Sequence, residues 1–214
     1  MSVKSALHPR NKHRNGYDFK TLVSFHPELS SFIIQNKHNQ QPTINFSDAD
    51  AVKALNMALL KKHYQVKYWD FPKGYLCPPI PGRVDYIHYL HDLLKESKLK
   101  DNDKITILDI GTGATCIYPI LGACEYDWNF VASDIDPISV KAASTNVTAN
   151  DKIAKKIDCR IQHNASHIFE GIIKPNEYFH LTLCNPPFHK SLNDAKTGTN
   201  RKWKNLNKNN SSQQ

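Results

Sequence analysis

The stretch that decides the fold is ITILDIGTGAT, residues 105–115. Its first half is apolar and rich in β-branched residues, which predicts a strand buried within a parallel sheet. The strand ends in the pattern Asp-x-Gly-x-Gly, and a helix-like segment follows. Glycines at this point permit a tight turn and a close approach of the backbone to a ligand at the carboxyl end of the strand.

The spacing of the glycines indicates which ligand such a loop would take. A dinucleotide-binding loop has a third glycine three residues after the second, where this chain has Cys116. The acidic Asp109 before Gly111 and the missing third glycine favour the S-adenosylmethionine-binding variant of the sheet. The alternative is a strand-to-helix turn that binds no ligand.

Two further strands are predicted after this loop. Residues 130–136 end in acidic residues about one strand–helix unit later, where the Asp134 carboxylate can accept ribose hydroxyls. Asp136 stands directly before Pro137, so we expect it to cap a helix that runs to about residue 150. A third strand fits residues 158–162. Gln162, His163 and Asn164 follow it, as adenine-recognising groups or as ordinary loop residues.

A fourth strand, HLTLC at 180–184, leads into Asn185-Pro186-Pro187-Phe188. The prolines end the strand because they lack an N–H for the ladder. The Asn185 side-chain oxygen and the Pro186 carbonyl can accept the two hydrogens of a planar amine, and Phe188 can stack on its ring. The alternative is a strand followed by a Pro-rich turn.

The alternation of strands and helices predicts the fold class α/β, a doubly wound Rossmann-like parallel sheet. Ligands of such sheets bind at the carboxyl edge. We therefore expect the glycine loop, Asp134 and Asn185 to converge there.

Composition limits the class of protein. The 214 residues carry a formal charge of +8 and a sequence pI of about 9.2, which suggests a polyanionic partner. The five cysteines form no Cys-x-x-Cys pair, which favours reduced thiols over disulfides or a zinc site. No apolar run is long enough for a signal peptide or a membrane span, so we expect a cytoplasmic location.

The first hundred residues predict a mainly helical extension. Residues 1–20 are basic and read as a phosphate-binding arm or a solvated terminus. A short helix is expected over 21–34, a loop over 35–47, and helices over about 51–64 and 84–97. Between the last two lies an aromatic, Pro-rich segment, residues 66–82, which we expect to be ordered.

Several motifs together resemble a known family. They are LHPRN (7–11), AVKALN (51–56), LCPP (76–79), PGR (81–83), DYIH (85–88), ILDIG (107–111), CIYP (116–119) and TLCNPPFH (182–189). The chain resembles the bacterial 23S ribosomal RNA adenine-N6 methyltransferases and, more distantly, eukaryotic methyltransferase-like protein 16. The resemblance implies a class I methyltransferase fold and methyl transfer from S-adenosylmethionine to the N6 of an adenine in 23S ribosomal RNA.

The resemblance also implies roles for individual residues. The cofactor loop falls on Asp109, Gly111 and Gly113, and the ribose-binding acid falls on Asp134. Arg83 would approach the methionine end of the cofactor, and Asn164 is a weaker match for an adenine contact. Residues 185–188 would form the catalytic motif for the target amine, with Asn185 also facing the cofactor. No metal is expected.

The predicted organisation has three parts. Residues 1–97 are an RNA-binding extension, 98–188 the methyltransferase core, and 189–214 a polar, basic, disordered tail. The residues predicted to hold RNA are Lys4, Arg10, Lys12, Arg14, Arg201 and Lys202. We expect a monomer with no membrane partner. Members of the family continue into further strands, so we expect a C-terminal truncation that exposes the sheet edge beside the fourth strand.

Other functions fit the same motifs. The same Asn-Pro-Pro-aromatic sequence serves enzymes that methylate adenine in DNA or glutamine in proteins, although the basic charge argues against the latter. A non-catalytic RNA-binding remnant and N6-adenine methylation of another structured RNA remain as alternatives.

Overall fold

The computed structural model describes residues 7–37, 39–97 and 104–186. A compact unit ends at Cys184, and a second unit begins at Asn185. All the helices and strands given below belong to the first unit.

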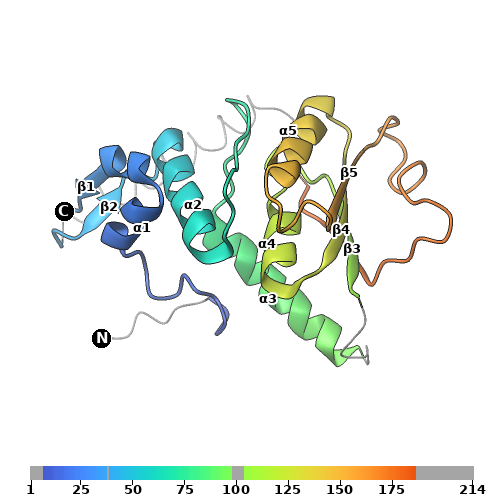
Figure 1. The fold of residues 1–214 in the computed structure, drawn as a ribbon, viewed down its shortest axis with the longest axis horizontal. Coiled ribbons are helices and arrows are strands. Elements are labelled where there is room, and N and C mark those ends of the chain that lie inside the picture. The colour runs from blue at the N-terminus through green and yellow to red at the C-terminus, as the bar shows by residue number, and fades with distance from the viewer. Residues whose placement is uncertain (1–6, 38, 98–103, 187–214) are drawn as a thin grey trace, which may run out of the picture. The chain divides into compact units, whose positions relative to one another are not determined.

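The centre of the first unit is a parallel sheet of four strands in the order β5-β4-β3-β6 (Figure 1). The strands are β3 (Thr106–Ile110), β4 (Asn129–Asp134), β5 (Ile157–Ile161) and β6 (Leu181–Cys184). The chain moves outward from β3 to β5 and then returns to the other side of β3. This reversal is a topological switch point, where such sheets bind ligands. The predicted fold class is confirmed, and β6 forms the predicted edge among the described strands.

The two faces of the sheet are covered differently. Helices α4 (Ile117–Tyr126) and α5 (Pro137–Thr148) lie with α3 (Ile80–Glu96) on one side of the sheet, and the segment 162–180 lies on the other (Figure 1). On the second side, Ile172 packs with Leu108 and Val131 in a small cluster of its own. The helical side carries the main hydrophobic core.

The N-terminal extension differs in part from its prediction. Instead of one helix over 21–34, α1 (Phe19–Phe25) ends before Pro27, and a 3-10 helix covers Pro27–Phe32. Pro27 explains the break, because proline cannot donate the backbone hydrogen bond that would continue an α-helix. The segment 35–47 was expected to be a loop, but it contains strand β2 (Pro42–Ile44). This strand pairs with β1 (Ile33–Gln35) in an antiparallel hairpin.

The two long helices of the extension begin at identifiable caps. Helix α2 (Ala49–Tyr64) begins after Asp48, whose carboxylate accepts from the backbone of Asp50 and Ala51. Helix α3 begins at Ile80, four residues before the predicted start, because Pro81 is tolerated in a first helical turn.

The Pro-rich segment is ordered, as predicted, and two buried asparagines of the α5 region hold it. The side-chain oxygen of Asn146 accepts from the Asp70 backbone at 2.8 Å, and its amide donates to the Asp70 carbonyl at 2.8 Å. Asn150 pairs in the same way with the backbone of Lys67 and Tyr68. These two side chains give the backbone of the segment the kind of hydrogen bonds that a neighbouring strand would supply in a sheet.

The extension and the sheet share one core. A single cluster of buried side chains runs from Phe19 in α1 to Leu183 in β6. Trp69 is 3% exposed, and its indole N–H donates to the Thr115 carbonyl at 2.8 Å, just after the glycine loop. The extension is therefore packed against the sheet. The predicted functional boundary at residue 97 stays a prediction, and the predicted tail 189–214 lies outside the described residues.

Close packing of α4 on β4 generates a stability prediction. A Cβ added at Gly122 would lie 2.5 Å from the Cζ atom of buried Phe130 and 3.1 Å from Trp128. Gly122→Ala should therefore lower the free energy of unfolding by about 1–3 kcal/mol, because overpacking forces the ring or the helix to move. Chemical denaturation of the purified chain measures this.

Gly82→Ala is the matched control, since nothing lies within 4 Å of the added Cβ and the residue is also helical. It should stabilise by up to about 1 kcal/mol through helix propensity. Equal effects of the two substitutions would contradict the packing argument.

Candidate functional site

The glycine loop after β3 is fastened to the end of β4. The backbone N–H groups of Gly111 and Thr112 donate to the Ser133 carbonyl at 2.8 and 2.9 Å. The Gly113 N–H donates to the Asp134 carboxylate at 2.8 Å. The structure thus brings together two of the predicted elements, the loop and the acid at the end of the next strand.

The ligand-facing side of the loop is open. Gly111 and Gly113 have φ values of +73° and +66°, which strain any residue with a side chain. A Cβ built on either glycine would meet no atom of residues 7–37, 39–97 or 104–186 within 4 Å. The glycines therefore leave space for a group that lies directly on the backbone.

Asp136 has the predicted capping role. Its carboxylate accepts from the backbone of Ile138 and Ser139, both at 3.1 Å, at the start of α5. The Tyr75 hydroxyl donates to it at 2.6 Å, which ties the Pro-rich segment to this corner of the site. Asp134 is left as the acid that faces the loop.

Asp109 is a buried acid with an unused oxygen. It is 1% exposed, and its Oδ2 atom has no hydrogen-bond partner among the residues that the structure describes. Burial raises the pKa of Asp109 to about 7, and the nearby charge of Asp134 adds to this rise. A hydrogen bond from Thr112 acts in the opposite direction and lowers the pKa. An unpartnered carboxylate oxygen at this depth suits a ligand cation.

Arg83 reaches the same region from the first turn of α3. Its Nη1 atom donates to the Tyr118 hydroxyl at 2.6 Å, and its buried Nε atom has no partner within the described part of the chain. Burial raises the pKa of Tyr118, the Arg83 charge lowers it, and the Asp109 charge raises it. Tyr118 therefore feels the charges of both Arg83 and Asp109, and both of these residues have a buried polar atom without a hydrogen-bond partner among the residues described.

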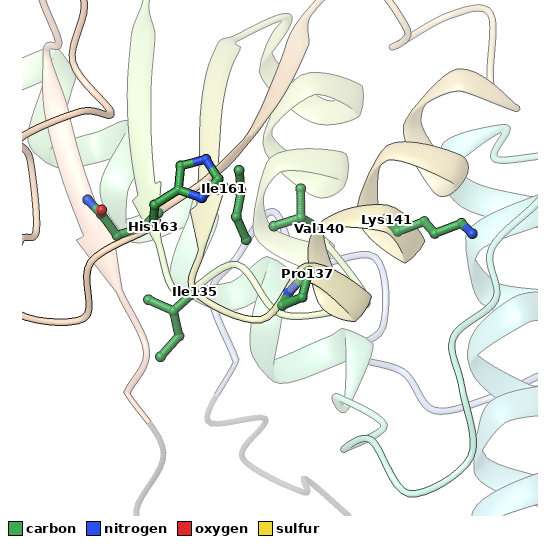
Figure 2. A pocket seen from close by; sticks show the side chains of 7 residues that line it. Ile135, Pro137, Val140, Lys141, Ile161 and His163 are labelled. Atoms are coloured by element: carbon green, nitrogen blue, oxygen red, sulfur yellow. The ribbon is translucent and has the colours of Figure 1, made fainter.

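An open groove of about 480 Å³ adjoins the ends of β4 and β5 (Figure 2). Its lining residues are Ile135, Pro137, Val140, Lys141, Ile161, Gln162 and His163. Figure 2 shows the aliphatic side chains of Ile135, Val140 and Ile161 around the groove, with the Lys141 side chain directed away from it. The shape and apolar walls suit a flat ring, since apolar lining with few polar groups is typical of small-molecule sites.

The sequence predicted a site at this carboxyl edge of the sheet, but it did not predict the apolar side chains that line the groove. The available signal was Ile135, an isoleucine between two acids, which is 60% exposed in the structure. Gln162 is engaged by its own surroundings: its amide donates to the Glu170 carbonyl, and its oxygen accepts from the Asn164 backbone, both at 2.9 Å. Asn164 is exposed, accepts from the Ser166 backbone at 3.0 Å, and is not among the residues that line the groove.

Asn185 follows the last residue of β6 directly. Strands β3 and β6 pair so that Cys184 is level with Ile110, the residue before the glycine loop. Asn185 and Pro186 begin the second unit, and Pro187 and Phe188 lie outside the described residues. The role of this motif stays a prediction.

Residues 7–16 are docked on the folded unit, so the interpretation as a solvated terminus is wrong for them. His8, Asn11 and His13 are buried, and the Asn11 amide donates to the Pro81 carbonyl and to Asp85, both at 2.9 Å. The His13 ring bonds to the Tyr64 hydroxyl at 2.8 Å.

The predicted RNA-binding cations of this segment have acidic partners. Arg10 pairs with Asp92 at 2.5 Å, and Lys12 pairs with Glu125 at 2.6 Å. Arg14 donates to the Pro9 carbonyl at 3.2 Å. Lys4, Arg201 and Lys202 lie outside the described residues. Contact with RNA stays a prediction for all six.

Within residues 7–37, 39–97 and 104–186, no three His, Cys, Asp or Glu side chains are grouped so as to hold a metal ion. None of the helices in the described part of the chain has the length and apolar character of a membrane span. All five cysteines are free thiols.

Comparison with known sequences gives a consistent result. A family model described as "RNA methyltransferase" matches residues 1–214. Ribosomal RNA large subunit methyltransferase F of Colwellia psychrerythraea is 56% identical over 209 residues, which cover 96% of this chain and 69% of that protein. The protein of that name from Aeromonas salmonicida is 56% identical over 201 residues, covering 93% of this chain and 63% of that protein.

A putative ribosomal RNA large subunit methyltransferase F from Vibrio cholerae is 56% identical over 206 residues, covering 96% of this chain and 57% of that protein. The chain therefore spans between 57% and 69% of the length of these three relatives.

Solved structures with the same fold include the METTL16 MTase domain, at 30% identity and a TM-score of 0.76, covering 88% of this chain and 73% of that one. The N-terminal domain of human METTL16 in complex with SAH has the same identity and TM-score, 30% and 0.76, over 87% of this chain and 72% of that one. The human METTL16 catalytic domain with MAT2A 3'UTR hairpin 6 is 31% identical with a TM-score of 0.74, over 89% of this chain and 63% of that one.

Burial of Asp109 generates a prediction about pH. Because its folded-state pKa of about 7 lies above the ordinary value of 3.8 for an aspartic acid, the folded state loses stability as pH rises between those values. Asp109→Asn keeps the shape and removes this cost. The gain in unfolding free energy over the unsubstituted chain should therefore grow by about 2–3 kcal/mol between pH 5 and pH 8.

Urea denaturation at the two pH values measures the effect. Asp151→Asn is the control, since the side chain of Asp151 is 87% exposed, and its effect should not change with pH. A gain from Asp109→Asn that is the same at pH 5 and pH 8 would contradict the raised pKa.

Proposed function

The chain belongs to the RNA methyltransferase family, and from this premise we propose that it transfers a methyl group from S-adenosylmethionine to the exocyclic N6 of an adenine in large-subunit (23S) ribosomal RNA. The observation that carries the proposal is the 56% identity, over 96% of the chain, to a protein named ribosomal RNA large subunit methyltransferase F. The geometry of the site supports it.

The residues present fit the amino-acid end of the cofactor. Arg83 has a buried N–H without a partner, which suits a carboxylate, and Asp109 has a buried oxygen without a partner, which suits an ammonium group. A zwitterionic amino acid needs both. Arg83 and Asp109 would hold these two groups. When bound, S-adenosylmethionine supplies a methyl group on a positively charged sulfur.

The residues at the other end of the site fit the adenosine part. Asp134 keeps lone pairs for ribose hydroxyls, because each carboxylate oxygen can accept more than the one bond it makes here. Gly111 and Gly113 leave their backbone uncovered, and the apolar groove beyond Ile135 accepts a flat base. Asn164 would contact the adenine only after a rearrangement of the turn in which its side-chain oxygen accepts from the Ser166 backbone.

Asn185 and Pro186 would hold the target adenine. The Asn185 side-chain oxygen and the Pro186 carbonyl would accept the two amine hydrogens, and the role proposed for Phe188 is to stack on the base. Two acceptors at the amine draw its lone pair out of conjugation and direct it to the methyl group. The protein would then act mainly by alignment and electrostatics. It needs no general base before transfer, because the nitrogen–carbon bond would form as the sulfur–carbon bond breaks to leave a neutral thioether, and the surplus proton of N6 would pass to water afterwards.

The target adenine must leave its stack to reach such a site, as enzymes that act on bases require. Contacts from Lys4, Arg14, Arg201 and Lys202 to phosphates would supply affinity without sequence choice. Arg10 and Lys12 could join them only by sharing or leaving Asp92 and Glu125. We propose the extension 1–97 as the RNA-binding part, 98–188 as the catalytic part, and a monomer acting in the cytoplasm.

A second candidate is N6-adenine methylation of another structured RNA. The observation that favours it is the relative solved with an RNA hairpin, at 31% identity. The choice between the two depends on the RNA that is offered.

The test is transfer of labelled methyl from S-adenosylmethionine to large-subunit RNA that lacks its adenine-N6 mark, followed by digestion to nucleosides. We expect label in N6-methyladenosine. Asn185→Ala should reduce transfer by at least about a hundredfold, because losing the amide oxygen removes an acceptor that aligns the amine. Binding of S-adenosylhomocysteine should change little.

A version extended to the length of the relatives serves as the positive control, and a hairpin RNA serves as the alternative substrate. Label only in the hairpin would favour the second candidate. Cofactor binding without label in either RNA, while the extended version is active, would favour the non-catalytic RNA-binding alternative. Loss of cofactor binding in Asn185→Ala would show that Asn185 had been assigned the wrong role.

A further inference from the structure

Arg83 is held at a defined angle by a residue of another helix. Its Nη1 atom donates to the Tyr118 hydroxyl at 2.6 Å, and its Cζ atom lies 5.3 Å from the centre of the Tyr118 ring. A guanidinium is planar, so fixing one of its nitrogens and one face also fixes where its other N–H groups point. The buried Nε atom, which has no partner, is one of these.

Tyr118 is itself placed by the glycine loop. It is the second residue of α4, whose N-cap residue Cys116 has a φ of 48° and follows the loop directly. Its ring is 8% exposed and makes an edge-to-face contact with Tyr86 of α3, with the ring centres 5.5 Å apart. One side chain therefore connects the loop after β3 to the arginine of α3.

The first turn of α3 is pinned from its other side. The Asn11 amide donates to the Pro81 carbonyl and to the Asp85 carboxylate, both at 2.9 Å, and the His8 backbone donates to the same carboxylate at 2.6 Å. Pro81 and Asp85, which accept these bonds, lie two residues before and two residues after Arg83. Because these bonds fix the backbone, the remaining freedom of Arg83 lies in its side chain, which Tyr118 restrains.

We propose that Tyr118 is a positioning residue, whose hydroxyl orients the Arg83 guanidinium toward the carboxylate of the cofactor's amino-acid part. The proposal rests on the proposed function, because it needs a ligand with that carboxylate. Tyr118 does not touch the ligand in this account. It acts through Arg83, so its effect should depend on the ligand having a carboxylate.

The experiment compares two ligands of the same protein. S-adenosylhomocysteine has the amino-acid part, and 5'-methylthioadenosine lacks it but keeps the adenosine and the sulfur. Tyr118→Phe keeps the ring and its contact with Tyr86 and removes only the hydroxyl. Calorimetry should show S-adenosylhomocysteine bound at least about tenfold more weakly, which is the lower end of the range for a lost hydrogen bond to a charged group, and 5'-methylthioadenosine bound as before.

Tyr86→Phe is the matched control, since it removes a hydroxyl from the other ring of the same pair. It should leave the affinities for both ligands unchanged. In an Arg83→Met background, Tyr118→Phe should add no further loss, because a positioning residue has no effect once the group it positions is gone. If Tyr118→Phe does not fold, Arg83→Met alone should show the same ligand-selective loss.

The possible results separate this inference from the proposed function. Unchanged affinity for S-adenosylhomocysteine in Tyr118→Phe, or in Arg83→Met, overturns the positioning role. Equal weakening of both ligands also overturns it and assigns Tyr118 to the shape of the loop. If the unsubstituted chain binds neither ligand, the proposed function itself fails, and the positioning role fails with it.

Discussion

The site depends on one hydrogen bond, from the Gly113 N–H to the Asp134 carboxylate at 2.8 Å. It joins the turn after β3 to the end of β4, beside two bonds from the same turn to the Ser133 carbonyl. Without it, the loop would have to find another acceptor for a backbone donor, and the carboxylate would be free to turn away. The register of the two strands places Ile110 opposite Ser133, and this brings the Gly113 N–H within hydrogen-bond distance of Asp134.

The sheet alone does not complete the site, because Arg83 comes from the extension. Its helix is held by Asn11 on one side and by Tyr118 on the other. Buried side-chain amides do much of this fastening: Asn146 and Asn150 bind the Pro-rich segment through its backbone. Such fully paired amides specify one arrangement, because any other arrangement leaves buried polar groups unsatisfied. The extension thus contributes Arg83 to the proposed cofactor site, in addition to its proposed role in RNA binding.

The features that could be predicted from sequence are those with a local signal. The four strands, the glycine turn and the cap at Asp136 follow from apolar runs, glycine spacing and Asp-x-Pro chemistry, and the family resemblance is confirmed by the comparisons. The burial of His8, the neutralisation of Arg10 by Asp92 and the groove at Ile161 were missed. Each depends on residues far apart in the chain, such as Arg10 and Asp92, which no periodicity relates.

The unpartnered oxygen of Asp109 has a consequence for the heat of binding. With a pKa of about 7, this carboxyl holds on average about half a proton at neutral pH. A ligand ammonium placed against it would lower that pKa and expel the proton into the buffer. The apparent enthalpy of cofactor binding would then vary with the ionisation enthalpy of the buffer, and affinity would rise with pH until the acid is fully ionised in the free protein. A buried acid would thereby couple recognition of the cofactor's zwitterionic amino-acid part to proton release.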